Sequence, residues 1–295
     1  MKITRLSLLI VALMSLSVMA RADSHIERTL ALASGGEFVL VSDAGSVSVT
    51  GSSVSGVRIV VTSNRNDLES LFNFDFEASD GVARVTARKK FFHWPSHLNL
   101  KFDVKVPERT RLSIRTGGGS VEISSLQGEQ HVYTSGGLID ASDVRGNVLA
   151  RTSGGAIHIR GVTGDADLGT SGGSIRVNSL NGSLEARTSG GPIRINGLTG
   201  RVSAHTSGGS IQAMLTRGDS QGGELETSGG SIRVSLDPRA NLNIDAATSG
   251  GSISSDLPLR VQGKISSSSL HGTLGSGGPT LLLRASGGSI RITSS

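Results

Sequence analysis

The chain has 295 residues, of which 36% are hydrophobic, 3% are aromatic and 18% are charged, with a net charge of +5. It contains 41 glycines and only 6 prolines, which excludes collagen and proline-rich linkers and favours regularly spaced tight turns. Cysteine is absent, which excludes disulfide bonds, thiolate-bound metals and a lipid-bearing cysteine in this chain.

Residues 1–22 have the three parts of a secretory signal peptide. Lys2 and Arg5 provide the positive start, residues 6–19 form an apolar run, and Ala20-Arg21-Ala22 is a small-residue cleavage site. The apolar run is shorter than the ~20 residues that a membrane-spanning helix needs. We therefore expect export to the periplasm, the cell surface or the medium, with no membrane span after cleavage.

Removal of this segment changes the interpretation of the charge. It carries three basic residues and no acidic ones, so the mature chain keeps 26 basic and 24 acidic residues and a net charge of +2. A charge this small is not the footprint of a nucleic-acid-binding protein, and we expect no nucleic-acid partner.

Residues 23–112 contain irregularly spaced β-patterns rather than repeats. Runs rich in valine, isoleucine and leucine alternate with polar residues and end at turn-forming residues, which predicts strands at 37–41, 46–50, 57–61, 82–86 and 98–106. Residues 67–72 are compatible with one helical turn. We interpret this region as an irregular β-cap over the first coil of the repeats, because an exposed ladder end invites edge-to-edge association.

Residues 113–295 repeat a short unit, and this repeat is the main signal in the sequence. Units open with threonine, which Ser-Gly-Gly follows in most cases, and the first openings are 18 residues apart: Thr116, Thr134, Thr152, Thr170, Thr188 and Thr206. The next two openings, Thr227 and Thr248, each lie 21 residues after the previous one, and a last unit opens at Ala285.

One unit, residues 170–187, illustrates the expected local structure. Residues 174–177 and 184–187 alternate between polar and apolar side chains, the period-two pattern of half-buried strands. Asn181-Gly182 lies between them and predicts a turn, since glycine tolerates the positive φ of such turns. Each unit is thus two strands and two corners with one apolar face.

A unit of this size buries its apolar face only by stacking on its neighbours, at a spacing of ~4.8 Å. We therefore predict an all-β fold: a β-solenoid of 18–21-residue coils, right-handed or of single-sheet type, with the N-terminal β-cap. A twisted β-sandwich or prism of the same hairpins is the alternative. In sequence order, the sixth positions should form an interior ladder of Val121, Ile139, Ile157, Ile175, Ile193, Ile211, Ile232, Ile253 and Ile290.

Several motifs of this chain occur together in one known family. They are Gly45-Ser-Val-Ser-Val49, Val104-Lys-Val-Pro107, the segment 112–121 and the Thr-Ser-Gly-Gly series that follows. Over residues 35–295 the chain resembles the putative adhesin family, a β-strand repeat domain of unknown function in exported bacterial proteins. The resemblance implies surface attachment, but the shared residues are turn and core residues and bring no binding residue with them.

The sequence gives little support for catalysis or metal binding. The repeats lack the carboxylate of calcium-binding β-rolls, and their Gly-rich corners lack the Gly-Lys-Ser/Thr ending of a phosphate loop. We also expect no hydrolase triad built on a Gly-x-Ser-x-Gly elbow. His93 and His97 flank Pro95, which excludes a helix that would align them for zinc. We therefore expect no metal, no cofactor and no enzymatic activity.

The seventh position of the units predicts a row on the outer surface. It changes from acidic to basic along the repeats: Glu122, Asp140, His158, Arg176, Arg194, Gln212 and Arg233. With Arg187 at a nearby eighteenth position, Arg176 and Arg194 are the expected ligand-binding residues, since guanidinium groups pair bidentately with anions.

We interpret the chain as a non-catalytic adhesin-like or scaffold protein that binds an acidic surface or extracellular polysaccharide. One alternative is a solvated face that only keeps the protein soluble. Another is a polysaccharide lyase on a β-helix, which would need a base beside an arginine in a groove.

We predict that mass spectrometry of the exported protein will give an N-terminus at Asp23 or within a few residues of it, because cleavage follows the small-residue site. Recovery of the chain with Met1 intact from the cell envelope would contradict this prediction.

Overall fold

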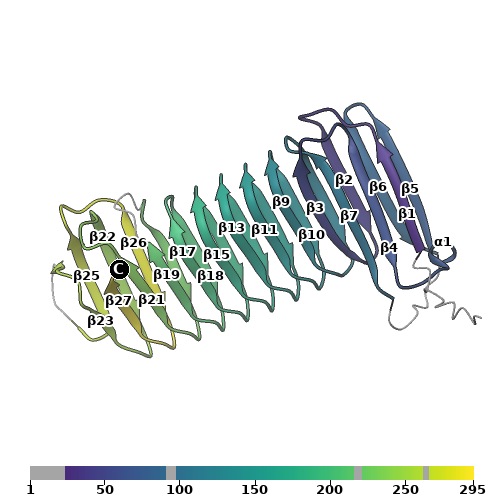
Figure 1. Cartoon of the computed structure of the whole chain (residues 1–295). Coiled ribbons are helices and arrows are strands. Elements are labelled where there is room, and N and C mark those ends of the chain that lie inside the picture. Colours follow the sequence, from purple (N-terminus) through teal and green to yellow (C-terminus); the bar gives the residue numbers. More distant parts are fainter. Residues whose placement is uncertain (1–23, 91–97, 216–220, 262–265) are drawn as a thin grey trace, which may run out of the picture.

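The computed structural model describes residues 24–90, 98–215, 221–261 and 266–295. The predicted signal peptide, Trp94 and the pair His93 and His97 lie outside these ranges. Two long β-sheets face each other along a rod (Figure 1), and we name the 13-stranded one sheet A and the 14-stranded one sheet B. The part of the chain that is described has one short helix, α1 (Leu68–Leu71), as expected for residues 67–72.

The spatial order of the strands across each sheet differs from their order along the chain. Sheet A consists of β1 (Ser24–Leu30), β4 (Val57–Ser63), β7 (Leu100–Pro107), β3 (Ser46–Ser52), β9 (Val121–Gln127), β11 (Ile139–Arg145), β13 (Ile157–Thr163), β15 (Ile175–Asn181), β17 (Ile193–Leu198), β19 (Ile211–Leu215), β21 (Ile232–Leu236), β27 (Ile290–Ser294) and β23 (Ile253–Ser255). Sheet B consists of β24 (Arg260–Val261), β25 (Ser269–Leu274), β22 (Leu242–Thr248), β26 (Thr280–Ala285), β20 (Gly223–Thr227), β18 (Val202–Thr206), β16 (Leu184–Thr188), β14 (Ala166–Thr170), β12 (Val148–Thr152), β10 (Gln130–Thr134), β8 (Arg111–Thr116), β2 (Glu37–Ser42), β6 (Val82–Lys89) and β5 (Phe72–Ser79).

Each repeat unit forms one coil that contributes one strand to each sheet, so the predicted β-solenoid is confirmed. Strands of neighbouring units pair in parallel and in register, as in Ile157, Ile175 and Ile193 of sheet A. These three isoleucines are completely buried between the sheets, among a continuous core of isoleucine, valine, leucine and alanine. Neighbouring coils therefore bury their apolar faces jointly, as the unit's small size requires.

The opening threonine of each unit links neighbouring coils at the Ser-Gly-Gly corner. The Thr170 hydroxyl donates to the carbonyl oxygen of Gly155 in the previous coil, over 2.8 Å, and accepts from the Gly173 N–H, over 3.2 Å. Thr170 is only 8% exposed, so its hydroxyl is satisfied within the protein. The donated bond recurs, over 2.9–3.1 Å, from Thr134 to Gly119, Thr152 to Gly137, Thr188 to Gly173 and Thr206 to Gly191.

A kink in the sheet A strands changes the phase of the side-chain alternation. Ser179 has a φ of 59°, in the left-handed region, and the ladder skips it, so that Leu180 points into the core. Non-glycine residues rarely adopt this conformation. The same position has φ values between 52° and 76° in four other coils: Ser125, Asp143, Gly161 and Gly197.

The C-terminal end of the rod departs from the order of the chain. The last strands, β26 and β27, are inserted between the pair β20–β21 and the pair β22–β23 (Figure 1). Ile290 therefore pairs with both Ile232 and Ile253. The predicted ladder residues are correct, but their predicted sequential order is wrong, because the corners after Thr227, Thr248 and Ala285 are chemically alike and do not specify which coils are neighbours.

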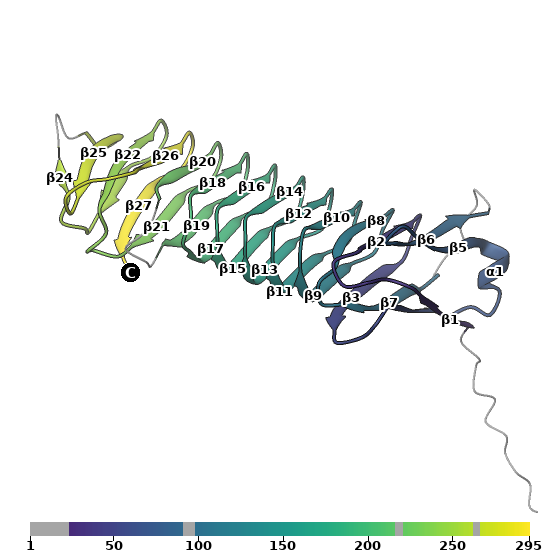
Figure 2. The same cartoon turned by 90° about the horizontal axis from the view of Figure 1, so that it is seen from above.

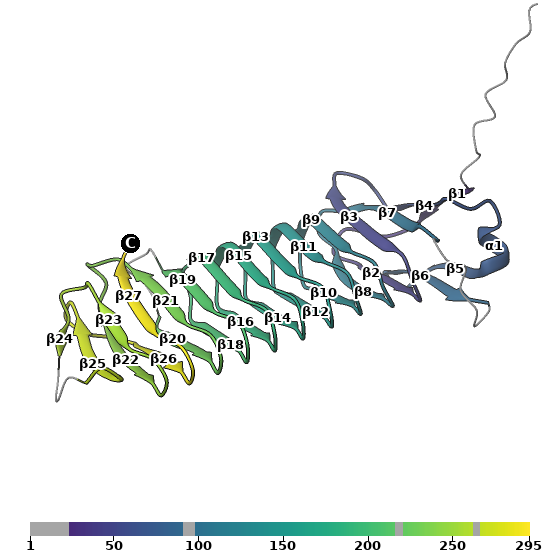
Figure 3. The same cartoon turned by 90° about the horizontal axis from the view of Figure 1, so that it is seen from below.

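The N-terminal end has a similar inversion. Strands β2 and β3 lie between the pair β6–β7 and the pair β8–β9, so the parallel ladders begin upstream of residue 113. The antiparallel strands β1, β4 and β5 and helix α1 lie at the outer end (Figures 2 and 3). Arg28 of β1 lies 5.8 Å from the centroid of the Phe76 ring of β5, so the two edge strands meet there. This end is the irregular β-cap predicted from the sequence.

Two adjacent glycines of one corner provide a test of coil stacking. A methyl group at Gly173 would overlap the backbone of Gly155, whereas at Gly172 the nearest atom outside the corner would be the Gly154 carbonyl oxygen, at 3.8 Å. We predict that Gly173→Ala destabilises the fold by about 1–3 kcal/mol through overpacking. Gly172→Ala should stay within about 0.5 kcal/mol of the parent.

Urea unfolding followed by circular dichroism would compare these two variants. Equal stability of the two would contradict the close approach of neighbouring corners.

Candidate functional site

The predicted row exists on the outer face of sheet A. Adjacent strands pair Asp140 with His158, His158 with Arg176, and Arg176 with Arg194. The row continues over the next three strands in the order Gln212, Arg233 and Arg291. We call Arg176, Arg194, Arg233 and Arg291 the arginine row. At a strand spacing of ~4.8 Å it extends over ~19 Å.

Arg291 was not among the predicted site residues. Its unit was expected to follow that of Ile253 along the rod, but insertion of β27 beside β21 places Arg291 directly next to Arg233. The seventh-position rule applied to the last unit would have found it.

The arginine row has few compensating charges. Arg194, Arg233 and Arg291 are exposed, and no ion pair of theirs occurs within the described ranges. Arg176 instead contacts a neutral partner: its Nη1 lies 3.3 Å from Nε2 of His158. Burial, with a contribution from the Arg176 charge, lowers the pKa of His158 below its ordinary value. A neutral imidazole can accept the Arg176 N–H.

Of the two acidic residues of the row, Asp140 is compensated. The Asp140 carboxylate pairs with Arg160, with 2.9 Å between Oδ1 and Nη2. Along this row, positive charge therefore begins at Arg176 and continues toward the C-terminal end of the rod.

Arg187 does not join the other two predicted site residues. It lies at the end of β16 in sheet B, on the opposite outer face from Arg176 and Arg194, and pairs with Glu185. The seventh and eighteenth positions of a unit belong to different strands of the coil, so their side chains project from different sheets. The structure thus brings together Arg176 and Arg194 only.

The outer face of sheet B largely neutralises itself. Four of its basic side chains pair with carboxylates on the same or adjacent strands: Arg151 with Asp167 over 2.6 Å, Arg187 with Glu185, His205 with Glu226 over 2.5 Å, and Arg284 with Asp245 over 3.1 Å. These cations of sheet B are therefore compensated, whereas, among the described residues, Arg194, Arg233 and Arg291 of the arginine row are not.

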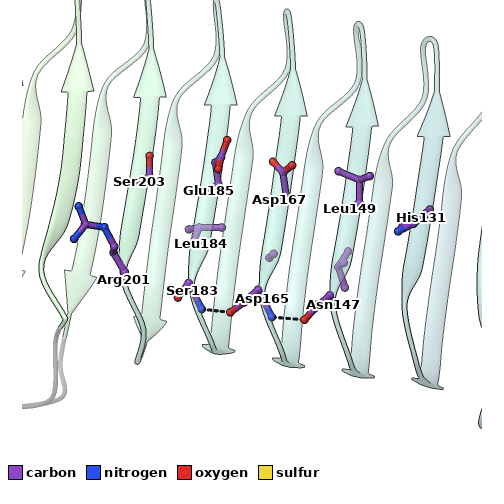
Figure 4. A pocket seen from close by; sticks show the side chains of 12 residues that line it. His131, Asn147, Leu149, Asp165, Asp167, Ser183, Leu184, Glu185, Arg201 and Ser203 are labelled. Atoms are coloured by element: carbon purple, nitrogen blue, oxygen red, sulfur yellow. Dashed lines mark hydrogen bonds between the residues drawn. The ribbon is translucent and has the colours of Figure 1, made fainter.

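A hollow of about 500 Å³ lies on sheet B across β10 to β18 (Figure 4). Asn147 accepts the Asp165 N–H over 3.0 Å, and Asp165 accepts the Ser183 N–H over 2.8 Å, forming a ladder along its edge. Asp167 and Glu185 face outward from adjacent strands, but arginines already pair with both carboxylates. They therefore offer no free acid–base couple for hydrolysis.

Metal sites and membrane helices are both missing from the described part of the chain. Within those ranges, no three histidine, aspartate or glutamate side chains are grouped to hold a metal ion. The helical content of the same ranges includes nothing long and apolar enough to cross a bilayer.

Several solved structures are similar to this chain. A putative adhesin from Parabacteroides merdae ATCC 43184 is 14% identical, with 92% of this chain and 96% of that chain covered and a TM-score of 0.47. A putative adhesin from Bacteroides fragilis NCTC 9343 is 13% identical, with 92% and 98% covered and a TM-score of 0.46. A putative lipid binding protein from Parabacteroides distasonis ATCC 8503 is 12% identical, with 92% and 96% covered and a TM-score of 0.41. None of these similarities is high enough to transfer a binding property.

No curated protein matches the chain. The family model described as Toastrack DUF4097 matches residues 84–293, from β6 to β27, and confirms the family resemblance inferred from the repeat motifs. Because this match spans more than two thirds of the sequence, the chain belongs to the Toastrack DUF4097 family.

Proposed function

We propose that this chain is an exported, non-catalytic adhesin-like protein that binds an acidic polysaccharide along the arginine row of sheet A. The observation that carries the proposal is the row itself: four arginines at one coil position on strands β15 to β27, in register. Three of them are exposed and have no ion pair within the described residues.

A polymer with repeated anionic groups suits this geometry better than a single anion does. Each guanidinium can hold a sulfate, phosphate or carboxylate through two parallel hydrogen bonds. An exposed contact of this kind is weak alone, but several contacts on one chain act at high effective concentration. Such a polymer would also relieve the repulsion between Arg176 and Arg194, whose Cα atoms are ~4.8 Å apart.

The contrast between the two faces favours binding over simple solvation. Solubility is served by charges of both signs interspersed over a surface, as on sheet B. On sheet A the acidic residues of the row stop at Asp140, which already pairs with Arg160. Uncompensated arginine in one line is therefore better explained as a binding surface.

Dextran sulfate and dextran, which share a backbone and differ in charge, provide the test. We expect binding to dextran sulfate only, weakening between low salt and 0.15 M salt because charges are screened beyond ~8 Å there. The triple variant Arg194→Ser, Arg233→Ser, Arg291→Ser should bind about tenfold more weakly, since it removes most of the row.

The matched control changes three exposed arginines outside the row: Arg111→Ser, Arg145→Ser and Arg201→Ser. It has the same net charge as the first variant but leaves the arginine row intact. It should therefore lose less than about threefold in affinity. Equal losses of affinity in the two triple variants would contradict the proposal, because binding would then depend on net charge and not on the arginine row.

The lowered pKa of His158 predicts a pH effect on binding. An ordinary histidine ring becomes protonated as the pH falls through its pKa of about 6.5. In the folded protein the pKa of His158 is lower, so the ring becomes protonated only at a lower pH. Protonation adds a positive charge beside Arg176, and a bound polyanion stabilises that charged form. Dextran sulfate should therefore bind more tightly near pH 5.5 than near pH 7.5. Its sulfate groups are ionised at both pH values, so the difference comes from the protein.

Titration of His158→Gln by the same binding assay should show a smaller pH effect. His205→Gln on sheet B, where the histidine pairs with Glu226, should keep the effect of the parent protein. A parent-like response in His158→Gln would contradict the assigned role of His158.

The lyase alternative makes a different prediction for the same row, since His158 beside Arg176 would then act as the base. Incubation with a polyuronate should leave its chain length unchanged if the protein only binds. Appearance of unsaturated chain ends that His158→Gln abolishes would establish the lyase instead.

A further inference from the structure

A second hollow on sheet B lies near the N-terminal end of the repeats and has a volume of about 410 Å³. Three basic side chains, one acidic side chain and one aromatic ring line it: Arg88, Arg115, Arg151, Asp43 and Tyr133. Arg115, Tyr133 and Arg151 occupy the same outer position on the adjacent strands β8, β10 and β12. Its volume lies within the range of small-molecule sites, roughly 300–1,000 Å³.

Arg115 is the uncompensated cation of this hollow. It is exposed, and its guanidinium carbon lies 4.8 Å from the centroid of the Tyr133 ring, within cation–π distance. No carboxylate pairs with Arg115 in the described part of the chain. The ring orders the guanidinium without neutralising it, which leaves its N–H groups available to an anion.

The other charged groups of the hollow are held by partners. Arg151 leans away from Tyr133 over Gly169, whose missing side chain leaves room for it, and pairs with Asp167. The Asp43 carboxylate accepts from Arg88 over 3.2 Å at one oxygen and from the Lys89 N–H over 2.9 Å at the other. Both oxygens of the carboxylate that lines the hollow are therefore occupied.

We infer that this hollow binds an anionic sugar, with the anionic group on Arg115 and the sugar ring beside Tyr133. Guanidinium groups pair bidentately with sulfate, phosphate or carboxylate, which selects an anion. An aromatic ring offers an apolar surface with a polar tip, and Ser135 and Ser153 add hydroxyl groups at the adjacent corners. The site lies on the opposite face from the arginine row, so it is independent of the proposed function.

The single tyrosine of the chain makes the site directly observable. Protein labelled with ¹³C in the tyrosine ring should give one set of ring signals by NMR, all from Tyr133. Titration with glucose 6-phosphate or glucuronate should shift these signals to saturation, and glucose should not shift them. Inorganic phosphate should need at least about fivefold higher concentration, because it lacks the ring that packs on tyrosine.

Arg115→Gln should weaken the binding of both anionic sugars by about tenfold or more, since it removes the ligating charge. Arg187→Gln changes the same strand position on β16, where Glu185 already pairs with the arginine, and should leave binding unchanged. The triple variant of the arginine row should also titrate like the parent, which separates the two proposals.

Three results would overturn the inference. They are the absence of a saturable shift of the Tyr133 signals, equal affinity for phosphate and the anionic sugars, and unchanged binding in Arg115→Gln.

Discussion

The stacking of corners on one another is the contact on which the rest of the rod depends. At the corners that open with threonine, a buried hydroxyl donates to a glycine carbonyl of the neighbouring coil, as from Thr170 to Gly155 over 2.8 Å. The second glycine of the same corner, Gly173, lies so close to Gly155 that no side chain fits between them. This combination sets both the distance and the register between coils, because a one-residue slip would leave the buried hydroxyl unpaired and turn apolar side chains outward.

Fixed register converts sequence spacing into straight rows of side chains. Residues 18 apart, such as Arg176 and Arg194, become neighbours across one strand pair, and chemically similar positions become continuous surfaces. The strand to which a position belongs decides its face, so Arg176 and Arg187 project from opposite sheets although they are only 11 residues apart. Charge compensation then distinguishes the rows on the two sheets. Arg151, Arg187 and His205 of sheet B pair with carboxylates, whereas in the described part of the chain the arginines of the row on sheet A do not.

Period-two alternation and glycine spacing were sufficient to predict the coils, the buried isoleucine ladder and the charged row. They could not predict the phase change before Leu180, because it depends on a left-handed Ser179, a conformation that serine seldom adopts. Strands β1 and β5 were missed, since edge strands at the cap have one partner and a weak alternation pattern. The sequence also could not show which face carries Arg187. The two strands of a unit belong to different sheets only because the coil closes, and the strand pattern alone does not show this closure.

The order of the last coils shows how a long-range choice shapes a surface. Ala285 replaces the opening threonine in the final unit, so the hydroxyl bond to the preceding corner is missing where β26 meets β20. On the other side the threonine bond is kept, because Thr248 donates to Gly288 over 2.7 Å. A sequential order would have placed Ser254 next to Arg233 and separated Arg291 from the row. Insertion of β27 instead joins Arg233 to Arg291 and leaves Ser254 at the outer edge of the sheet. The topology of the C-terminal end thereby extends the uncompensated positive charge by one strand. With the strands in chain order, Ser254 would have interrupted the row between Arg233 and Arg291.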